Sequence, residues 1–337
     1  MAGKAESLPI LWKELGEHID LDPVTKLNGQ VYLGCTQHEV PPNKELIKEK
    51  CEMFSKLITA KVAQPETTKD LAAGGDSMLT STAGGDLKHL AQQALSHGMV
   101  THILPPSKVS PDKVKAYNND MCGHVEQCVE RYLELAHLQI SDLKTVSTPC
   151  MDDHQFKPED FENKGKLAPI ASRVVLKALY TARHGRPDTL WTVNYLARHV
   201  TKWTVACDKR LHRLMAYFWH TRHFVQHCFV GNTPEQCYLG LFVDASFAGD
   251  LEDSKSTSGC ILCLFGSATF VPLAWFCKKQ TAVSHSSSEA ELIALDAALR
   301  LEGLPTLQFW EFVLEILNPD STIAHRAVSY THLTLPT

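Results

Sequence analysis

The spacing of hydrophobic residues changes once along this chain of 337 residues. Up to about residue 221, apolar side chains recur every three or four positions, as they do on one face of an α-helix. The clearest case lies within 112–139, where the apolar positions are Cys128, Val129, Tyr132, Leu133 and Ala136. This spacing predicts an amphipathic helix. Three further helices are predicted at 169–183, 188–200 and 205–221, and Pro187 fits the first turn of the second.

After residue 237 the pattern becomes that of strands. Segments 238–246, 260–265 and 269–277 are rich in β-branched and aromatic residues, and polar or glycine-bearing links join them, which predicts an antiparallel meander. Ser286 and Glu289 then have the spacing of a capping box, so a helix is expected from there to about Leu301. The segment 303–305 should break it before a second helix at 306–317.

The first 155 residues have a less regular pattern. A turn entering a strand is predicted at 29–34 and a helix at 43–60, whereas 61–88 contains two Gly-Gly-Asp triplets and is predicted to be a loop, with a short helix at 88–96. Residues 151–165 are acidic and polar, so Asp152 and Asp153 are expected to belong to a linker. The expected fold class is therefore α/β, with an α+β arrangement in the N-terminal part.

The last eleven residues, 327–337, follow neither helical nor strand spacing. Their sequence, AVSYTHLTLPT, matches the translation of an end sequence used in transposase-based sequencing adapters. We expect this tail to be an artefact and leave it out of the fold prediction, as one would a cloning scar. The natural reading frame is then expected to have been cut near Arg326.

The charge is unevenly distributed. The whole chain has a formal net charge of −5, yet residues 164–227 contain twelve Lys and Arg against two Asp, a charge of +10. Such a segment can bind phosphates without reading sequence, although a solvated helical face explains the charges equally well. The candidate contacts are Arg173, Lys177, Arg183, Arg186, Arg198, Lys202, Lys209, Arg210 and Arg213. Trp191, Trp203, Tyr217 and Trp219 could stack on bases, but their helical spacing is more typical of core residues.

Composition narrows the cellular setting. An apolar content of 44% is too high for a wholly disordered chain. The sequence contains no run of eighteen uncharged apolar residues, so a membrane span is not predicted. The N-terminus does not resemble a signal peptide, so the eleven cysteines are expected to be reduced thiols inside the cell, in cytoplasm or nucleus. Structural zinc is disfavoured, because Cys260 and Cys263 would point to opposite faces of a strand and Cys128 belongs to the buried side of its helix.

The predicted meander contains an aspartate, Asp244, although aspartate is a poor strand former. A carboxylate on a central strand, with a second on a helix packed over the sheet, is an arrangement that can bind Mg²⁺ for phosphodiester hydrolysis. The alternative is a strand-end aspartate that begins a turn, with solvated glutamates on the following helix. The residues alone leave both interpretations open.

Several motifs occur here in a specific order. They are Asp244 within YLGLFVDAS, AGD at 248–250, STSG at 256–259, Trp275 before KKQ, and SEAEL at 288–292. In that order they resemble the ribonuclease H region of copia-type LTR retrotransposon Pol polyproteins. Upstream, VNYLAR at 193–198 resembles the helix before that domain, and KTVSTP at 144–149 resembles the end of the reverse transcriptase. The resemblance is strong over 168–317, patchy over 12–60 and 112–155, and absent over 61–111; Phe247 stands where the family usually has Trp.

The resemblance implies a domain division: 1–155 is the end of a reverse transcriptase with an insertion at 61–111, 164–227 a basic helical connection, and 236–326 a truncated ribonuclease H-like domain, a three-stranded meander plus helix. It further implies Asp244 and Glu291 as the first two Mg²⁺ ligands, while Asp296 lies too far around the helix. Two later carboxylates and the polymerase aspartates are missing from the chain.

The resemblance also implies an activity, two-metal hydrolysis of RNA in an RNA–DNA hybrid, with the rest of the Pol polyprotein as partner. Since half of the carboxylates are missing, the chain itself is expected to be inactive or nearly so. The alternative function is a non-catalytic nucleic-acid-binding remnant, and a third is a metal-free interaction protein. Cleavage that depends on Asp244 would favour the enzyme, and hybrid binding that survives its loss would favour the remnant.

Overall fold

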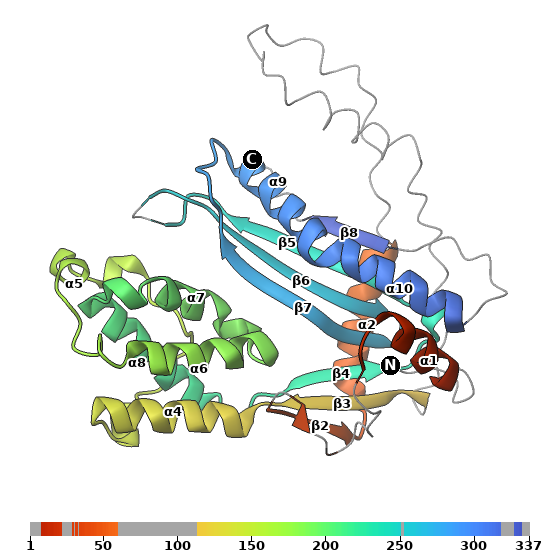
Figure 1. Cartoon of the computed structure of the whole chain (residues 1–337), viewed down its shortest axis with the longest axis horizontal. Coiled ribbons are helices and arrows are strands. Elements are labelled where there is room, and N and C mark those ends of the chain that lie inside the picture. Colours follow the sequence, from red (N-terminus) through yellow and green to blue (C-terminus); the bar gives the residue numbers. More distant parts are fainter. Residues whose placement is uncertain are drawn as a thin grey trace, which may run out of the picture.

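The computed structural model describes residues 8–21, 29, 31–32, 34–59, 113–250, 253–317 and 327–331. The predicted insertion at 61–111, including its short helix, lies outside the described residues. The described parts form a helical body and a long twisted sheet, which lie side by side in Figure 1. The α/β class predicted from the sequence is confirmed.

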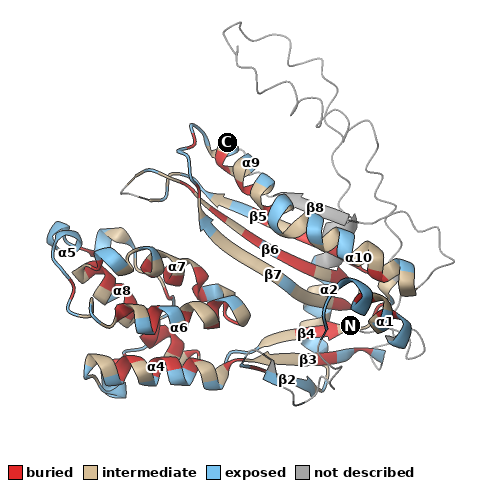
Figure 2. Cartoon of the chain, viewed as in Figure 1, coloured by how far each residue is buried: buried red, intermediate tan, exposed pale blue. Residues whose placement is uncertain are grey.

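Four helices build the helical body: α4 (Cys122–Ala136), α6 (Ala171–His184), α7 (Leu190–Arg198) and α8 (Val205–His220). Their apolar faces meet in one core, in which Val129, Val175, Val193 and Phe218 have no exposed surface. Figure 2 shows these buried faces turned inward. The three helices predicted between 169 and 221 are confirmed, and Pro187 begins the short turn Pro187–Thr189 that precedes α7. The short helix α5 (Pro158–Glu162) packs against α8.

The helix expected within 112–139 is shorter than its apolar pattern suggested. Lys115–Asp120 forms strand β3, and α4 begins only at Cys122. The strand pairs on both sides, with β2 (Cys35–Val40) and with β4 (Gln226–Val230), so partners distant in sequence satisfy its backbone hydrogen bonds. Sheet pairing therefore overrides the local preference in this segment.

The predicted meander is formed by β5 (Tyr238–Ser246), β6 (Thr257–Gly266) and β7 (Thr269–Lys279). All three strands are antiparallel, with Asp244 opposite Gly259 and Cys260 opposite Phe276. Helix α9 (Ser287–Ala298) covers one face of this meander. The side chain of Ser286 accepts a hydrogen bond from the Glu289 N–H, as in the predicted capping box, but the Glu289 carboxylate accepts from the N–H of His285.

One continuous sheet joins the N-terminal and C-terminal parts of the chain. The described strands run in the order β1-β2-β3-β4-β7-β6-β5-β8, where β1 is Val31–Tyr32. The junction is narrow, since β4 pairs with β7 at a single position, Phe229 opposite Phe270. The backbone of Ala327–Thr331, which the sequence analysis assigned to an adapter-derived tail, forms strand β8 and pairs in parallel with β5.

Two side chains attach the helical body to the sheet. The Trp275 indole N–H on β7 donates to the carbonyl of Ala182 on α6 at 2.9 Å. The Asn194 amide on α7 donates to the carbonyl of Cys277 on β7 at 2.7 Å. These bonds hold α6 and α7 against the face of the meander that α9 does not cover.

Residues 303–305 were predicted to break the helix that follows the meander. Instead, a π-helical turn, Leu299–Gly303, leads into α10 (Leu304–Leu317). The N–H of Leu304 donates to the carbonyl of Leu299, five residues earlier, and this wider turn is where Pro305, which has no N–H, enters the helix. Helix α1 (Leu8–His18) packs against α10, and α2 is Lys44–Thr59.

The close packing of α9 on the sheet yields a stability prediction. Ala290, Ala294 and Ala298 are fully buried, and the last two pack in one cluster with residues of β5 and β6. Ala294→Leu should lower the free energy of unfolding by about 1–3 kcal/mol, because the added side chain has no space. Leu292→Ala, on the exposed side of the same helix, should change it by less than about 0.5 kcal/mol. Urea denaturation measures both, and equal effects would contradict this packing.

Candidate functional site

Asp244, the first residue implied as a metal ligand, lies near the end of β5 with an exposed side chain. Successive strand residues point to opposite faces of a sheet. Leu241, Val243 and Ala245 pack in the cluster beneath α9. Phe242 and Asp244 therefore belong to the other face, which is turned toward the helical body. Within the described part of the chain, the Asp244 carboxylate has neither a hydrogen bond nor an ion pair.

Glu291, the second implied ligand, lies on α9 and is half-buried beside the stripe of alanines that faces the sheet. Gln280 fixes the position of the first turn of α9 along the sheet. Its amide donates to the carbonyl of Ala290 and to the hydroxyl of Ser258. Ser258 pairs with Ala245, the residue after Asp244. The two predicted ligands therefore lie at the same end of the meander, but α9 covers the face opposite to Asp244.

The ligands that magnesium prefers can be compared with the side chains around Asp244. Mg²⁺ requires oxygen ligands in a near-octahedral set, usually one or two carboxylates together with water or phosphate. Among the described residues, no three His, Cys, Asp or Glu side chains lie close enough to share a metal ion. Asp244 belongs to one face of the meander, and Glu291 lies on the helix that covers the other face. Among the described residues, Asp244 and Glu291 therefore lack the further ligand that a site of three protein groups would need.

A cavity separates Asp244 from the helical body. Its volume is about 870 Å³, and its walls are mostly apolar. The sheet contributes Phe242, Asp244 and Trp275, and the start of α7 contributes Leu190 and Trp191. Asp188 also lines the cavity, but its charge is paired with Arg186. Among the described residues that line this cavity, Asp244 is therefore the carboxylate without an ionic partner.

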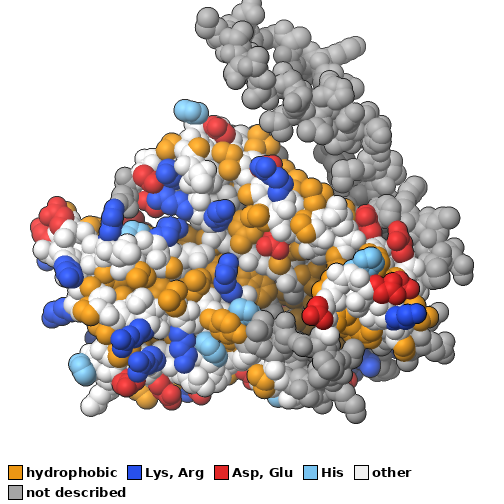
Figure 3. Space-filling model, in the orientation of Figure 1, with side chains coloured by type: hydrophobic (Ala, Val, Ile, Leu, Met, Phe, Trp, Pro, Cys, Tyr) orange, Lys and Arg blue, Asp and Glu red, His pale blue; other side chains and the backbone are white. Residues whose placement is uncertain are grey.

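The nine basic residues predicted to contact nucleic acid have different environments. Arg173, Arg183, Arg198, Lys202 and Lys209 are exposed, and Lys177 and Arg213 are half-buried. Figure 3 shows Lys and Arg side chains spread over the visible face of the helical body, with hydrophobic patches between them. Some of these charges are already occupied, because Lys209 pairs with Asp160 at 2.5 Å and Arg213 donates to the carbonyl and hydroxyl of Thr148.

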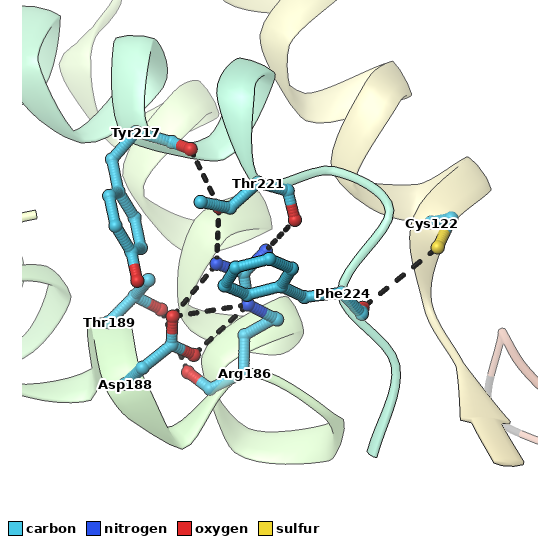
Figure 4. Close-up of polar contacts among 7 residues, drawn as sticks. All are labelled: Cys122, Arg186, Asp188, Thr189, Tyr217, Thr221 and Phe224. Carbon is cyan, nitrogen blue, oxygen red and sulfur yellow. Dashed lines mark hydrogen bonds and ion pairs between the residues drawn. The ribbon is translucent and has the colours of Figure 1, made fainter. Parts of the chain in front are cut away.

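Arg186 has a structural role, contrary to its predicted place at a phosphate-binding surface. Its side chain is 2% exposed and forms a forked ion pair with Asp188, at 2.8 Å for the closest atoms. The same guanidinium donates to the carbonyl and the hydroxyl of Thr221 at the end of α8 (Figure 4). It also lies about 5.5 Å from the rings of Tyr217 and Phe224. All of these contacts lock the turn before α7 to the end of α8.

Arg210 is the second exception, with 1% exposure. Its guanidinium donates to the carbonyl of Met151, pairs with Asp153, and lies 4.5 Å from the ring of Tyr195. A basic residue in a helix was expected to be exposed, but the acidic segment folds over it. Asp152 and Asp153, interpreted from the sequence as linker residues, begin the turn that covers this arginine.

An ionic cluster at the β5–β6 loop was not predicted from the sequence. Asp250 accepts from Lys279 at 2.6 Å and lies 3.8 Å from Arg198 on α7. Lys279 also pairs with Asp253 at 2.8 Å, and its hydrogen bond lowers the pKa of that carboxyl. Asp250 belongs to the AGD motif and Lys279 to the KKQ motif, so the motifs were visible, but nothing in their spacing indicated that they meet. The cluster links α7 to the end of the meander that carries the β5–β6 loop, which we call its open end.

Comparisons with known proteins support one part of the resemblance. The retrovirus-related Pol polyprotein from transposon TNT 1-94 of Nicotiana tabacum is 29% identical over 174 residues, which is 50% of this chain and 12% of that protein. Those from transposons RE1 and RE2 of Arabidopsis thaliana are each 32% identical, over 157 and 158 residues, 47% of this chain and 10% of each protein. The chain thus spans about a tenth of the length of these curated relatives.

These similarities support the interpretation of the chain as a piece of a retrotransposon polyprotein. No family model matches the chain. No solved structure matches it either. Among the helices that the structure describes, none has both the length and the apolar character needed to cross a membrane.

The different environments of Arg183 and Arg186 predict different effects of their loss. Arg186→Ala should lower the free energy of unfolding by about 2–4 kcal/mol, because Asp188 and Thr221 lose their buried partner; the one-third exposure of Asp188 limits the cost. Arg183→Ala, exposed on α6, should change it by less than about 0.5 kcal/mol. Thermal and urea denaturation test this pair, and a stable Arg186→Ala protein would contradict the structural role.

Proposed function

We propose that this chain is a piece of a copia-type Pol polyprotein, the end of its reverse transcriptase followed by a ribonuclease H-like region. In this proposal the helical body binds the sugar-phosphate backbone of an RNA–DNA hybrid or another nucleic acid. The rest of the polyprotein is its partner in the parent element, inside the cell in cytoplasm or nucleus. The order of motifs from Asp244 to Glu291 and the similarity to three Pol polyproteins support it.

The observation that carries the binding proposal is a set of exposed cations without acidic partners. Arg173 and Arg183 on α6 and Lys202 after α7 have no hydrogen bond or ion pair from their side chains to other described residues. A solvated cation of this kind is available to a phosphate, whereas Arg186 and Arg210 are buried and form ion pairs within the protein. Contacts through such side chains position a duplex without reading its bases.

The chain as it stands is proposed to bind without cleaving. In the parent polyprotein, the resemblance implies that Asp244 and Glu291 hold Mg²⁺ during hydrolysis of the RNA strand. Here the two carboxylates lie on opposite sides of the meander, and no third described carboxylate joins them. Magnesium binding is therefore expected to be weak or absent, and this chain is expected to act as a non-catalytic nucleic-acid-binding module.

Salt dependence tests the binding proposal. Arg173→Ala combined with Arg183→Ala should lower the slope of log affinity against log salt by about 2 for an RNA–DNA hybrid, because each phosphate contact contributes about one unit. Lys13→Ala, an exposed cation on α1 far from the helical body in sequence, is the matched control and should leave the slope unchanged. Fluorescence anisotropy of a labelled hybrid measures it. A wild-type chain that binds no hybrid at low salt would refute the proposal.

A cleavage assay tests the proposed inactivity. The chain should release no labelled RNA fragments from the hybrid in millimolar Mg²⁺, and Asp244→Asn should bind the hybrid as tightly as the wild type. Magnesium-dependent cleavage that disappears in Asp244→Asn would show that the chain is an enzyme. Glu289→Gln, at the start of α9, controls for a general effect of removing a carboxylate from this region.

A further inference from the structure

Three aromatic rings, two on α7 and one on the residue that follows it, form a continuous stack. The rings of Trp191 and Tyr195 lie 5.7 Å apart at an angle of 22°, and those of Tyr195 and His199 lie 4.3 Å apart at 24°. The residues are four positions apart, so they follow one face of the helix. The Nδ1 atom of His199 lies 2.8 Å from the carbonyl of Tyr195, which fixes the orientation of that ring. The stack is thus a pre-ordered surface rather than three independent side chains.

All three rings line a second cavity, of about 500 Å³, between α7 and the open end of the meander. The opposite wall comes from the β5–β6 end, with Ser246, Gly249 and Thr257. Most stacked aromatic residues of a globular protein are buried in its core, but this stack forms the wall of a cavity. An aromatic ring that enters the cavity would meet ring faces or edges along one side.

The charges around this cavity favour an anionic ligand. Arg198 and Lys202 line it, and both are exposed. Its two acidic residues are already paired, Asp153 with Arg210 and Asp250 with Lys279, while Arg198 lies at the longer distance of 3.8 Å from Asp250. The Lys202 side chain has no partner among the residues that the structure describes. A ligand with a flat ring and a negative charge therefore matches the wall.

We propose that this cavity binds unpaired nucleotides of a single strand, with a base stacked on the aromatic ladder of Trp191, Tyr195 and His199 and phosphates on Arg198 and Lys202. The inference rests on the proposed function and specifies a second mode of binding. A duplex keeps its bases paired and stacked inside, so it offers no free ring to the ladder. An unpaired base exposes its ring, and stacking on aromatic side chains tolerates any base.

The position of Trp191 extends the path of such a strand. Trp191 lines both this cavity and the larger one that contains Asp244. A strand that leaves the ladder at Trp191 therefore passes next to the wall that carries Asp244. The helical body binds a duplex on its exposed cations, whereas the space between this body and the sheet holds a single strand.

Fluorescence anisotropy of end-labelled oligothymidylate, with the full chain, tests the inference. Trp191→Leu keeps an apolar side chain of similar reach but removes the ring, so its affinity for oligothymidylate should fall roughly tenfold. Trp191→Phe should retain most of the affinity. Trp219→Leu is the matched control, because this half-buried tryptophan lies on α8 outside the cavity, and it should bind as the wild type does.

The RNA–DNA hybrid is the second ligand of the same experiment, and its binding should be unchanged in Trp191→Leu. If Trp191→Leu binds oligothymidylate as the wild type does, the stacking site is refuted while hybrid binding stands. If Trp191→Leu weakens both ligands equally, the specificity for a single strand is refuted. If the wild-type chain binds neither ligand, both this inference and the proposed function fail. Circular dichroism establishes that each variant is folded.

Discussion

The contact of the helical body with β7 determines which residues surround Asp244 and where the two cavities lie. Trp275 and Asn194 each donate one hydrogen bond to a backbone carbonyl across this contact. A net hydrogen bond contributes only about 1 kcal/mol, but these two bonds also fix which face of the meander the helices cover. Both cavities, the aromatic ladder beside them and the environment of Asp244 depend on that choice.

The two faces of the meander consequently have different uses. Beneath α9, the small side chains of Ala290, Ala294 and Ala298 allow the helix to approach the sheet closely, which leaves no room for a ligand. On the other face, the rings of Trp275 and Trp191 line the cavity between the meander and the helical body. The face of the meander beneath α9 is therefore closely packed, whereas the face toward the helical body borders a cavity.

The sequence predicted the elements that depend on local spacing. The helices of the basic connection and the three strands of the meander follow from period and turn residues, and these are confirmed. Pairings between distant segments could not be predicted in this way, because β3 is defined by β2 and β4 and not by its own residues. For the same reason, the burial of Arg186 and Arg210 could not be predicted from the sequence. Their ionic partners are Asp188, in a turn, and Asp153, in a segment predicted to be a linker. The placement of Asp244 and Glu291 on opposite sides also needed the sheet.

The π-helical turn after α9 has a consequence for the rotational phase of the helix that follows. Each added residue rotates a helix by about 100°, so one extra residue turns every later side chain away from the direction it would otherwise have taken. Val313 is the buried residue of α10. It meets Leu11 and Leu15 of α1 instead of the meander. The helical segment after the meander thus packs on the sheet before the π-helical turn and on α1 after it, which connects two segments that are far apart in the sequence.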